Sequence, residues 1–144
     1  MTSIRKHMSK KNVVIIDGQG GRLGQMLIES IIKENIECEL TAVGTNTLAT
    51  SAMLKAGARK GATGENPVIV ACRDADIIMG PIGIIAADSL TGEITPAMAV
   101  AVGQSKALKL LLPVSHCNNT VIGIKQLSMV DLIKAATEEL KANL

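Results

Sequence analysis

Apolar positions in this chain form short uninterrupted runs, and these runs alternate with segments in which apolar residues recur every three or four positions. Short runs bounded by glycine, proline or polar residues predict buried strands, and the longer period predicts amphipathic helices. The runs that predict strands lie at 13–16, 39–43, 76–79 and 108–114, with shorter third and sixth strands expected at 58–60 and 121–124.

Helix starts follow several of these runs. Helices are expected from Leu23 to about residue 32, from a cap at Thr45 or Asn46 to Lys55, from Thr95-Pro96 to about Lys106, and from Ser128 onward. Asn66-Pro67 fits the start of another helix, although the following Val68-Ile69-Val70 is equally typical of a strand. Residues 82–94 predict one helical turn and a loop.

Strands whose residues are apolar on both sides are typical of a parallel sheet that is covered on both faces. Alternation of such strands with helices predicts an α/β fold, with a doubly wound, mainly parallel sheet of five or six strands (Rossmann-like). We expect residues 12–144 to form a single domain. Residues 1–11, with Arg5, Lys6, Lys10 and Lys11 and no acid, are expected to be a basic flexible arm.

Composition narrows the chemistry. The chain has no Phe, Tyr or Trp, so a mechanism with a tyrosine proton donor, such as the Tyr-Lys pair of short-chain dehydrogenases, is excluded. Its three cysteines show no C-x-x-C spacing, and no apolar run is long enough to cross a bilayer. These features favour a cytoplasmic protein that does not bind membranes. The chain has no continuous row of basic residues, so binding to nucleic acid is not expected.

The segment from Asn12 to Ile32 carries the candidate site. An apolar run ends at Asp17, four glycines follow within seven residues, and an amphipathic helix begins. Glycines let a ligand approach the backbone, and the first N–H groups of a helix attract anions. The turn therefore predicts a phosphate-binding site, formed by Gly18, Gln19, Gly20, Gly21, Arg22, Leu23 and Gly24. Gly21→Val is expected to abolish binding while leaving the protein folded.

The spacing G-x-x-G-x-x-G through Gly18, Gly21 and Gly24 resembles the loop of extended and atypical short-chain dehydrogenases and related NAD(P)-binding regulators. The resemblance implies that NAD or NADP is the ligand, with its pyrophosphate over Gly20–Arg22. Two features depart from this pattern. The second strand ends at Gly44 without the acid that holds an NAD ribose. Asp17 would repel a phosphate unless it is hydrogen-bonded away or bridged by a metal, and we expect it to bind the N–H groups of the turn.

In a doubly wound sheet the ligand crevice opens at the carboxyl ends of the strands. The segments expected to meet there are 17–24, 44–46, 80–83 and 115–119. The candidate site therefore also includes Thr45 and Asn46, which either bind ribose hydroxyls or cap a helix. Gly80 and Pro81 complete the set.

Two other kinds of chemistry fit single features of the sequence. His116-Cys117 could form a nucleophile–base couple, but adjacent residues rarely point at each other. Acids in loops could bind Mg²⁺, namely Asp17, Glu65, Asp88 and Glu93. Carboxylates in turns are usually solvated or capping, so no metal is predicted.

The segments DGQGG, TGENP, ADIIMGPIGII and GEITPAMA resemble a family of short, uncharacterised bacterial Rossmann-like proteins, from about Asn12 to the C-terminus. The resemblance implies the fold and carries no activity. Three functions remain open: a nucleotide-binding protein that acts as a sensor, a small NAD(P)-dependent reductase acting as a homodimer, and a scaffold or interaction protein without a ligand.

Overall fold

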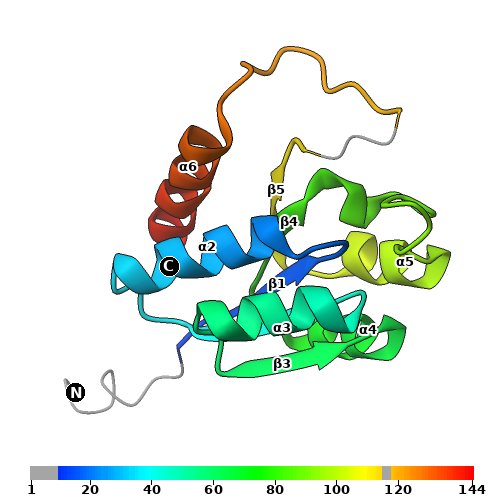
Figure 1. Ribbon diagram of the computed structural model, residues 1–144, viewed down its shortest axis with the longest axis horizontal. Helices are drawn as coiled ribbons and strands as arrows, with labels where there is room; N and C mark the ends of the chain where they lie inside the picture. The colour runs from blue at the N-terminus through cyan, green and yellow to red at the C-terminus, as the bar shows by residue number, and fades with distance from the viewer. Residues whose placement is uncertain (1–9, 115–117) are drawn as a thin grey trace.

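The computed structural model describes residues 10–114 and 118–144, in which strands and helices alternate along the chain (Figure 1). The predicted basic arm therefore lies outside the described residues except for Lys10 and Lys11. The elements are β1 (Asn12–Asp17), α2 (Arg22–Lys33), β2 (Glu39–Gly44), α3 (Thr47–Ala56), β3 (Lys60–Thr63), α4 (Glu65–Asp74), β4 (Ile77–Pro81), the short 3-10 helix η1 (Ile82–Ile85), α5 (Pro96–Gln104), β5 (Leu108–Leu112) and α6 (Met129–Ala142).

The five strands form one sheet in the order β3-β2-β1-β4-β5, and every pair is parallel. Strand β1 is central, with Val13 opposite Leu40 of β2 on one side and Ile77 of β4 on the other. The chain thus winds outward in both directions from β1, which confirms the predicted doubly wound α/β, Rossmann-like arrangement. The register places Asp17 opposite Gly44, so the turn after β1 lies beside the end of β2.

Both faces of the sheet are covered by helices, which explains why the strands are apolar without alternation. Val13 and Ile15 of β1 join a core cluster with α2, α3 and α6, whereas Val14 and Ile16 join a second cluster with α4 and α5. Leu27 and Met53 are fully buried in the first cluster, and Val102 is fully buried in the second. With no aromatic residue in the chain, aliphatic side chains and methionine fill both layers.

Several predicted boundaries were wrong. Residues 121–124 form no strand: Gly123 has a φ of 85°, and the Ile122 side chain is 88% exposed instead of packing on the sheet. The segment from residue 118 to α6 runs outside the layers (Figure 1, orange). Asn66 is not the cap of α4, because the helix already begins at Glu65 after Gly64, whose φ is 112°.

Strand β3 covers Lys60–Thr63, so it shares only Lys60 with the strand expected at 58–60, and the stretch Val68–Val70 is helical and not a strand. The predicted caps of two helices are confirmed. Thr95 caps α5 by accepting a hydrogen bond from Met98 N–H, and Ser128 caps α6 by accepting one from Asp131 N–H. In the described residues, no helix has both the length and the apolar character that crossing a bilayer requires.

The packing predicts that substitutions of Ile15 and Ile122 affect stability to different extents. Ile15 is fully buried, so Ile15→Ala should lower the free energy of unfolding by about 2–5 kcal/mol through lost burial and a residual cavity. Ile122→Ala changes an exposed side chain and should stay within about 0.5 kcal/mol of the wild type. Urea denaturation followed by far-ultraviolet circular dichroism measures both, and equal effects would contradict the core assignment.

Candidate functional site: the glycine turn between β1 and α2

The carboxylate of Asp17 holds the turn between β1 and α2 together. Its Oδ1 accepts a hydrogen bond from Gly18 N–H at 2.8 Å, and its Oδ2 accepts one from Gly24 N–H at 2.8 Å. Helix α2 begins after Gly21, which offers no side chain to cap it. Asp17 therefore caps the helix from the end of the preceding strand. This agrees with the expectation that the acid binds the N–H groups of the turn.

Asp17 is 5% exposed, and its surroundings shift its ionisation. Burial raises the pKa of this carboxyl above its ordinary value, the hydrogen bonds from Gly24 and Gly18 lower it in part, and the negative charge of Glu93 raises it further. A second acid therefore lies close enough to the turn to influence its electrostatics.

Three of the four glycines in the turn are closely packed, and the fold requires glycine most strictly at Gly21. A Cβ on Gly21 would lie 2.7 Å from Ala49 Cα, and the φ of Gly21 is 73°. A Cβ on Gly18 would lie 2.6 Å from Thr45 Oγ1, and one on Gly24 would lie 2.5 Å from Met53 Sδ. The expectation that Gly21→Val leaves the protein folded is therefore wrong, because this substitution collides with the backbone of α3.

Gly20 is the exception. A Cβ at this position would meet no atom within 4 Å, and its φ lies outside the left-handed region. The residue is exposed, so neither packing nor backbone conformation requires a glycine here. Glycine also lets another molecule approach the backbone closely, and Gly20 is open to such an approach.

The carboxylate of Glu93 reaches the same turn from the loop after η1. Its Oε1 accepts hydrogen bonds from Gln19 N–H at 2.8 Å, from Asn46 Nδ2 at 2.9 Å and from the Thr45 hydroxyl. Burial raises the pKa of Glu93, but the hydrogen bonds from Thr45, Gln19 and Asn46 outweigh it, so the pKa lies below its ordinary value. Glu93 is therefore ionised at neutral pH and supplies a negative charge between the turn and the end of β2.

Two buried side chains fix the loop that carries Glu93. Leu90 and Ile94 are 2% and 1% exposed and belong to the core cluster beneath α4 and α5. The loop closes through hydrogen bonds from Asp88 N–H to Ile94 O at 2.7 Å and from Ile94 N–H to Ser89 O at 3.1 Å. Positive φ angles at Leu90 and Thr91, 53° and 56°, show that this geometry is held against the usual preference of such residues.

Two backbone donors of the turn remain without a protein acceptor in the described part of the chain. These are the N–H groups of Gly20 and Arg22. The N–H groups of Gly18, Leu23 and Gly24 bind the carboxylate of Asp17, Gln19 N–H binds Glu93, and Gly21 N–H donates to the carbonyl oxygen of Gly18. Arg22 is exposed, and the first turn of α2 contains no acid. The guanidinium group and both free donors therefore lie within three successive residues at the positive end of the α2 dipole.

The other predicted residues have structural roles. Asn46 caps α3 through its Oδ1, which accepts a hydrogen bond from Ala49 N–H at 2.8 Å, and its amide also donates to Gln19 O at 3.0 Å. The side chain of Leu23 is in the core beneath α2. Gly80 and Pro81 are buried at the end of β4, where a Cβ on Gly80 would contact the carbonyl oxygen of Ile16.

The sequence also offered a metal site and a nucleophile–base couple. Among the described residues, no three His, Cys, Asp or Glu side chains gather closely enough to hold a metal ion. Glu65 accepts a hydrogen bond from the Thr95 hydroxyl at 2.6 Å, so it is engaged elsewhere. The couple His116-Cys117 lies outside the described residues.

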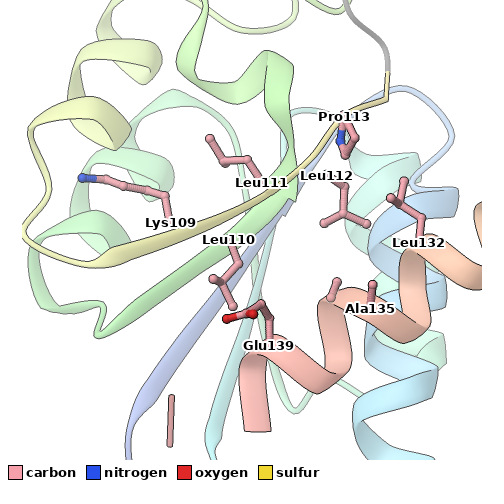
Figure 2. Close-up of a pocket in the computed structure, with 9 residues that line it drawn as sticks. Lys109, Leu110, Leu111, Leu112, Pro113, Leu132, Ala135 and Glu139 are labelled. Atoms are coloured by element: carbon pink, nitrogen blue, oxygen red, sulfur yellow. The ribbon is translucent and has the colours of Figure 1, made fainter. Parts of the chain in front are cut away.

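A separate groove of about 370 Å³ lies between β5 and α6, and Figure 2 shows Leu110 and Leu112 of the strand facing Leu132 and Ala135 of the helix. It includes no residue of the glycine turn. Two larger hollows, of about 670 and 770 Å³, lie around Cys38 and along residues 113–114 and 118–132. Neither of them includes a residue of the turn.

The fold and this turn define a doubly wound α/β protein with a glycine-rich strand-to-helix connection. The chain belongs to the family described as Domain of unknown function (DUF3842), whose match covers residues 12–144. This confirms the expected membership in an uncharacterised family. No curated protein matches the chain.

The hydrogen bonds of Asp17 predict a large effect of Asp17→Ala on stability. The substitution leaves Gly18 N–H and Gly24 N–H without an acceptor, which should cost about 1–3 kcal/mol for each group, offset in part by removal of a buried charge. Asp88→Asn, in an exposed loop at a φ of 65° that suits asparagine, is the control and should cost less than about 1 kcal/mol. Urea denaturation measures the difference, and equal stability of the two variants would refute the capping role of Asp17.

A second prediction compares the effects on stability of substituting Gly21 and Gly20. Gly21→Ala should destabilise the protein by about 1–3 kcal/mol, because it forces a Cβ against Ala49 at a φ of 73°. Gly20→Ala should change the unfolding free energy by no more than about 0.5–1 kcal/mol, because no atom lies near the added methyl group. Thermal melting in the absence of ligand measures both, and a destabilised Gly20→Ala would show that Gly20 has a structural role.

Proposed function

We propose that the protein binds a nucleotide of the NAD(P) type at the turn between β1 and α2, with a phosphate group against the N–H groups of Gly20 and Arg22. The observation that carries the proposal is Gly20, which the fold does not require to be glycine and whose backbone is open to solvent. A bound phosphate would approach the chain at this point. A side chain there would hinder the approach.

The electrostatics of the turn support an anion at this position in spite of the two nearby acids. Asp17 and Glu93 already have hydrogen-bond donors from Gly18, Gly24 and Gln19. A phosphate would take the remaining donors and the Arg22 guanidinium, which pairs with phosphate through two parallel hydrogen bonds. The positive end of the α2 dipole adds to this attraction.

We propose that the site binds a nucleotide and does not catalyse a reaction on it. The chain has no tyrosine to donate a proton, and the site as described offers donors that hold an anion and no nucleophile–base pair. A sensor, in which nucleotide binding changes the surface around the turn, therefore fits these residues better than a reductase does.

A specific observation favours a second candidate, a scaffold that binds no nucleotide. Glu93 takes the hydrogen bonds of Gln19, Thr45 and Asn46, and these three residues are among those expected to contact the ligand. In this alternative the carboxylate substitutes for a lost ligand and locks the turn. The two candidates differ in whether Gly20 N–H and Arg22 N–H acquire an acceptor.

Thermal melting with NAD⁺ or NADP⁺ tests the proposal. A ligand that binds only the folded protein stabilises it by about 2.7 kcal/mol at a hundred times its Kd. The wild type should therefore melt at a higher temperature with at least one of these nucleotides. Gly20→Val should abolish the shift while retaining the melting temperature of the free protein, because the added side chain covers the backbone and a Cβ at this position meets no atom within 4 Å.

A charge variant and its matched control complete the experiment. Arg22→Ala should weaken binding about two- to fivefold, as expected for an exposed ion pair, whereas Lys33→Ala at the other end of α2 should leave it unchanged. Failure of either nucleotide to shift the melting temperature at millimolar concentration would reject nucleotide binding and favour the scaffold. Equal effects of Arg22→Ala and Lys33→Ala would place the ligand elsewhere.

A further inference from the structure

Glu93 presents one carboxylate oxygen that the described residues leave open. Its Oε1 accepts hydrogen bonds from Gln19, Thr45 and Asn46, whereas Oε2 has no partner in the described part of the chain. The buried anchors Leu90 and Ile94 hold the loop, so the carboxylate is fixed before any ligand arrives. A fixed acceptor with a free oxygen can bind a hydroxyl group without first having to reorganise.

The position of this carboxylate is the second part of the argument. It contacts Thr45 and Asn46, which directly follow β2, and Gln19, which directly precedes the free donor of Gly20. In dinucleotide-binding folds an acid at the end of the second strand binds the ribose hydroxyls next to the pyrophosphate. Strand β2 ends here in Gly44, without an acid, and Glu93 brings a carboxylate to the same place from the loop after η1.

We propose that Glu93 binds the ribose of the ligand, with Oε2 accepting its hydroxyl groups, and thereby selects nucleotides with a free 2′-hydroxyl over those with a 2′-phosphate. This inference rests on the proposed nucleotide site. It narrows the ligand class from NAD(P) to NAD and to related nucleotides with an unmodified ribose.

The negative charge of Glu93 accounts for the proposed selectivity for NAD over NADP. A 2′-phosphate would bring two negative charges against an ionised carboxylate, and like charges at such distances repel strongly. Sites that accept a 2′-phosphate place an arginine near this position, but β2 ends in Gly44 and is followed by Thr45 and Asn46, all of which are uncharged. The free hydroxyl of NAD would instead donate to the carboxylate, as in a charge-assisted hydrogen bond.

Calorimetric titration with NAD⁺ and NADP⁺ of the wild type, Glu93→Gln and Asp88→Asn tests the inference. The wild type should bind NAD⁺ at least about tenfold more tightly than NADP⁺, the loss expected when a hydrogen bond to a charged group is replaced by repulsion. Glu93→Gln removes the charge, so NAD⁺ binding should weaken about tenfold and the difference between the two nucleotides should largely disappear.

Asp88→Asn is the matched control. It removes a charge from the same loop, its φ of 65° suits asparagine, and its side chain makes no hydrogen bond in the described residues. This variant should bind both nucleotides as the wild type does. Melting of the free proteins by circular dichroism verifies that each variant is folded, and Glu93→Asp serves as a second test, since it keeps the charge but shortens its reach.

Three outcomes are distinguishable. If the wild type binds neither nucleotide, the proposed function fails and the inference fails with it. If the wild type binds both equally and Glu93→Gln alters neither, the nucleotide site stands and the ribose role of Glu93 is overturned. If Glu93→Gln binds both nucleotides, and inorganic pyrophosphate, more tightly than the wild type, Glu93 is an internal competitor of the ligand, which also overturns the inference.

Discussion

The arrangement of the site depends on one carboxylate, that of Asp17, which connects the end of β1 to the start of α2. By accepting hydrogen bonds from both Gly18 and Gly24, it fixes the turn between them and satisfies a buried donor at the first turn of the helix. Burying the charged carboxylate is unfavourable, and the hydrogen bonds from these N–H groups compensate for it in part. Burial nevertheless raises the pKa of Asp17 above its ordinary value. With the turn held from below by Asp17, its outer N–H groups keep a fixed direction.

Two carboxylates therefore divide the donors of a single turn. Asp17 takes the N–H groups of Gly18 and Gly24, Glu93 takes that of Gln19, and those of Gly20 and Arg22 have no acceptor among the described residues. Two acids beside an anion-binding turn would repel an anion if they had no hydrogen-bond donors of their own. Because both are hydrogen-bonded, their charges are partly compensated by N–H dipoles, and the residue that carries one of the open donors, Arg22, is itself positively charged.

Much of the fold could be predicted from the sequence because its determinants are local. The strand at 13–16, the glycine turn and the amphipathic helix follow one another within about twenty residues, and caps such as Thr95 and Ser128 act on N–H groups three residues away. The wrong predictions concern segments whose conformation depends on contacts with distant parts of the chain. Apolar residues 121–124 resemble a strand, yet no sheet edge pairs with them.

The site was less predictable than the fold for the same reason. Glu93 lies 74 residues from Gln19, and only the sheet order and the core anchors of its loop bring them together. The sequence allowed Glu93 to be grouped with Asp17 as an alternative metal ligand, but not to be identified as a hydrogen-bond acceptor at the turn. Likewise, the four glycines look equivalent in sequence, and only the neighbouring atoms of α3 separate Gly21, which the fold requires, from Gly20, which it does not.

Backbone amide chemical shifts test the central claim most directly, because they report on the donors themselves. In a titration of the uniformly ¹⁵N-labelled protein with NAD⁺, the largest saturable changes should occur at the amides of Gly20 and Arg22, with smaller changes at Gly18 and Gly24, whose N–H groups remain bound to Asp17. Saturable changes confined to other parts of the chain, or no changes at millimolar NAD⁺, would contradict the account.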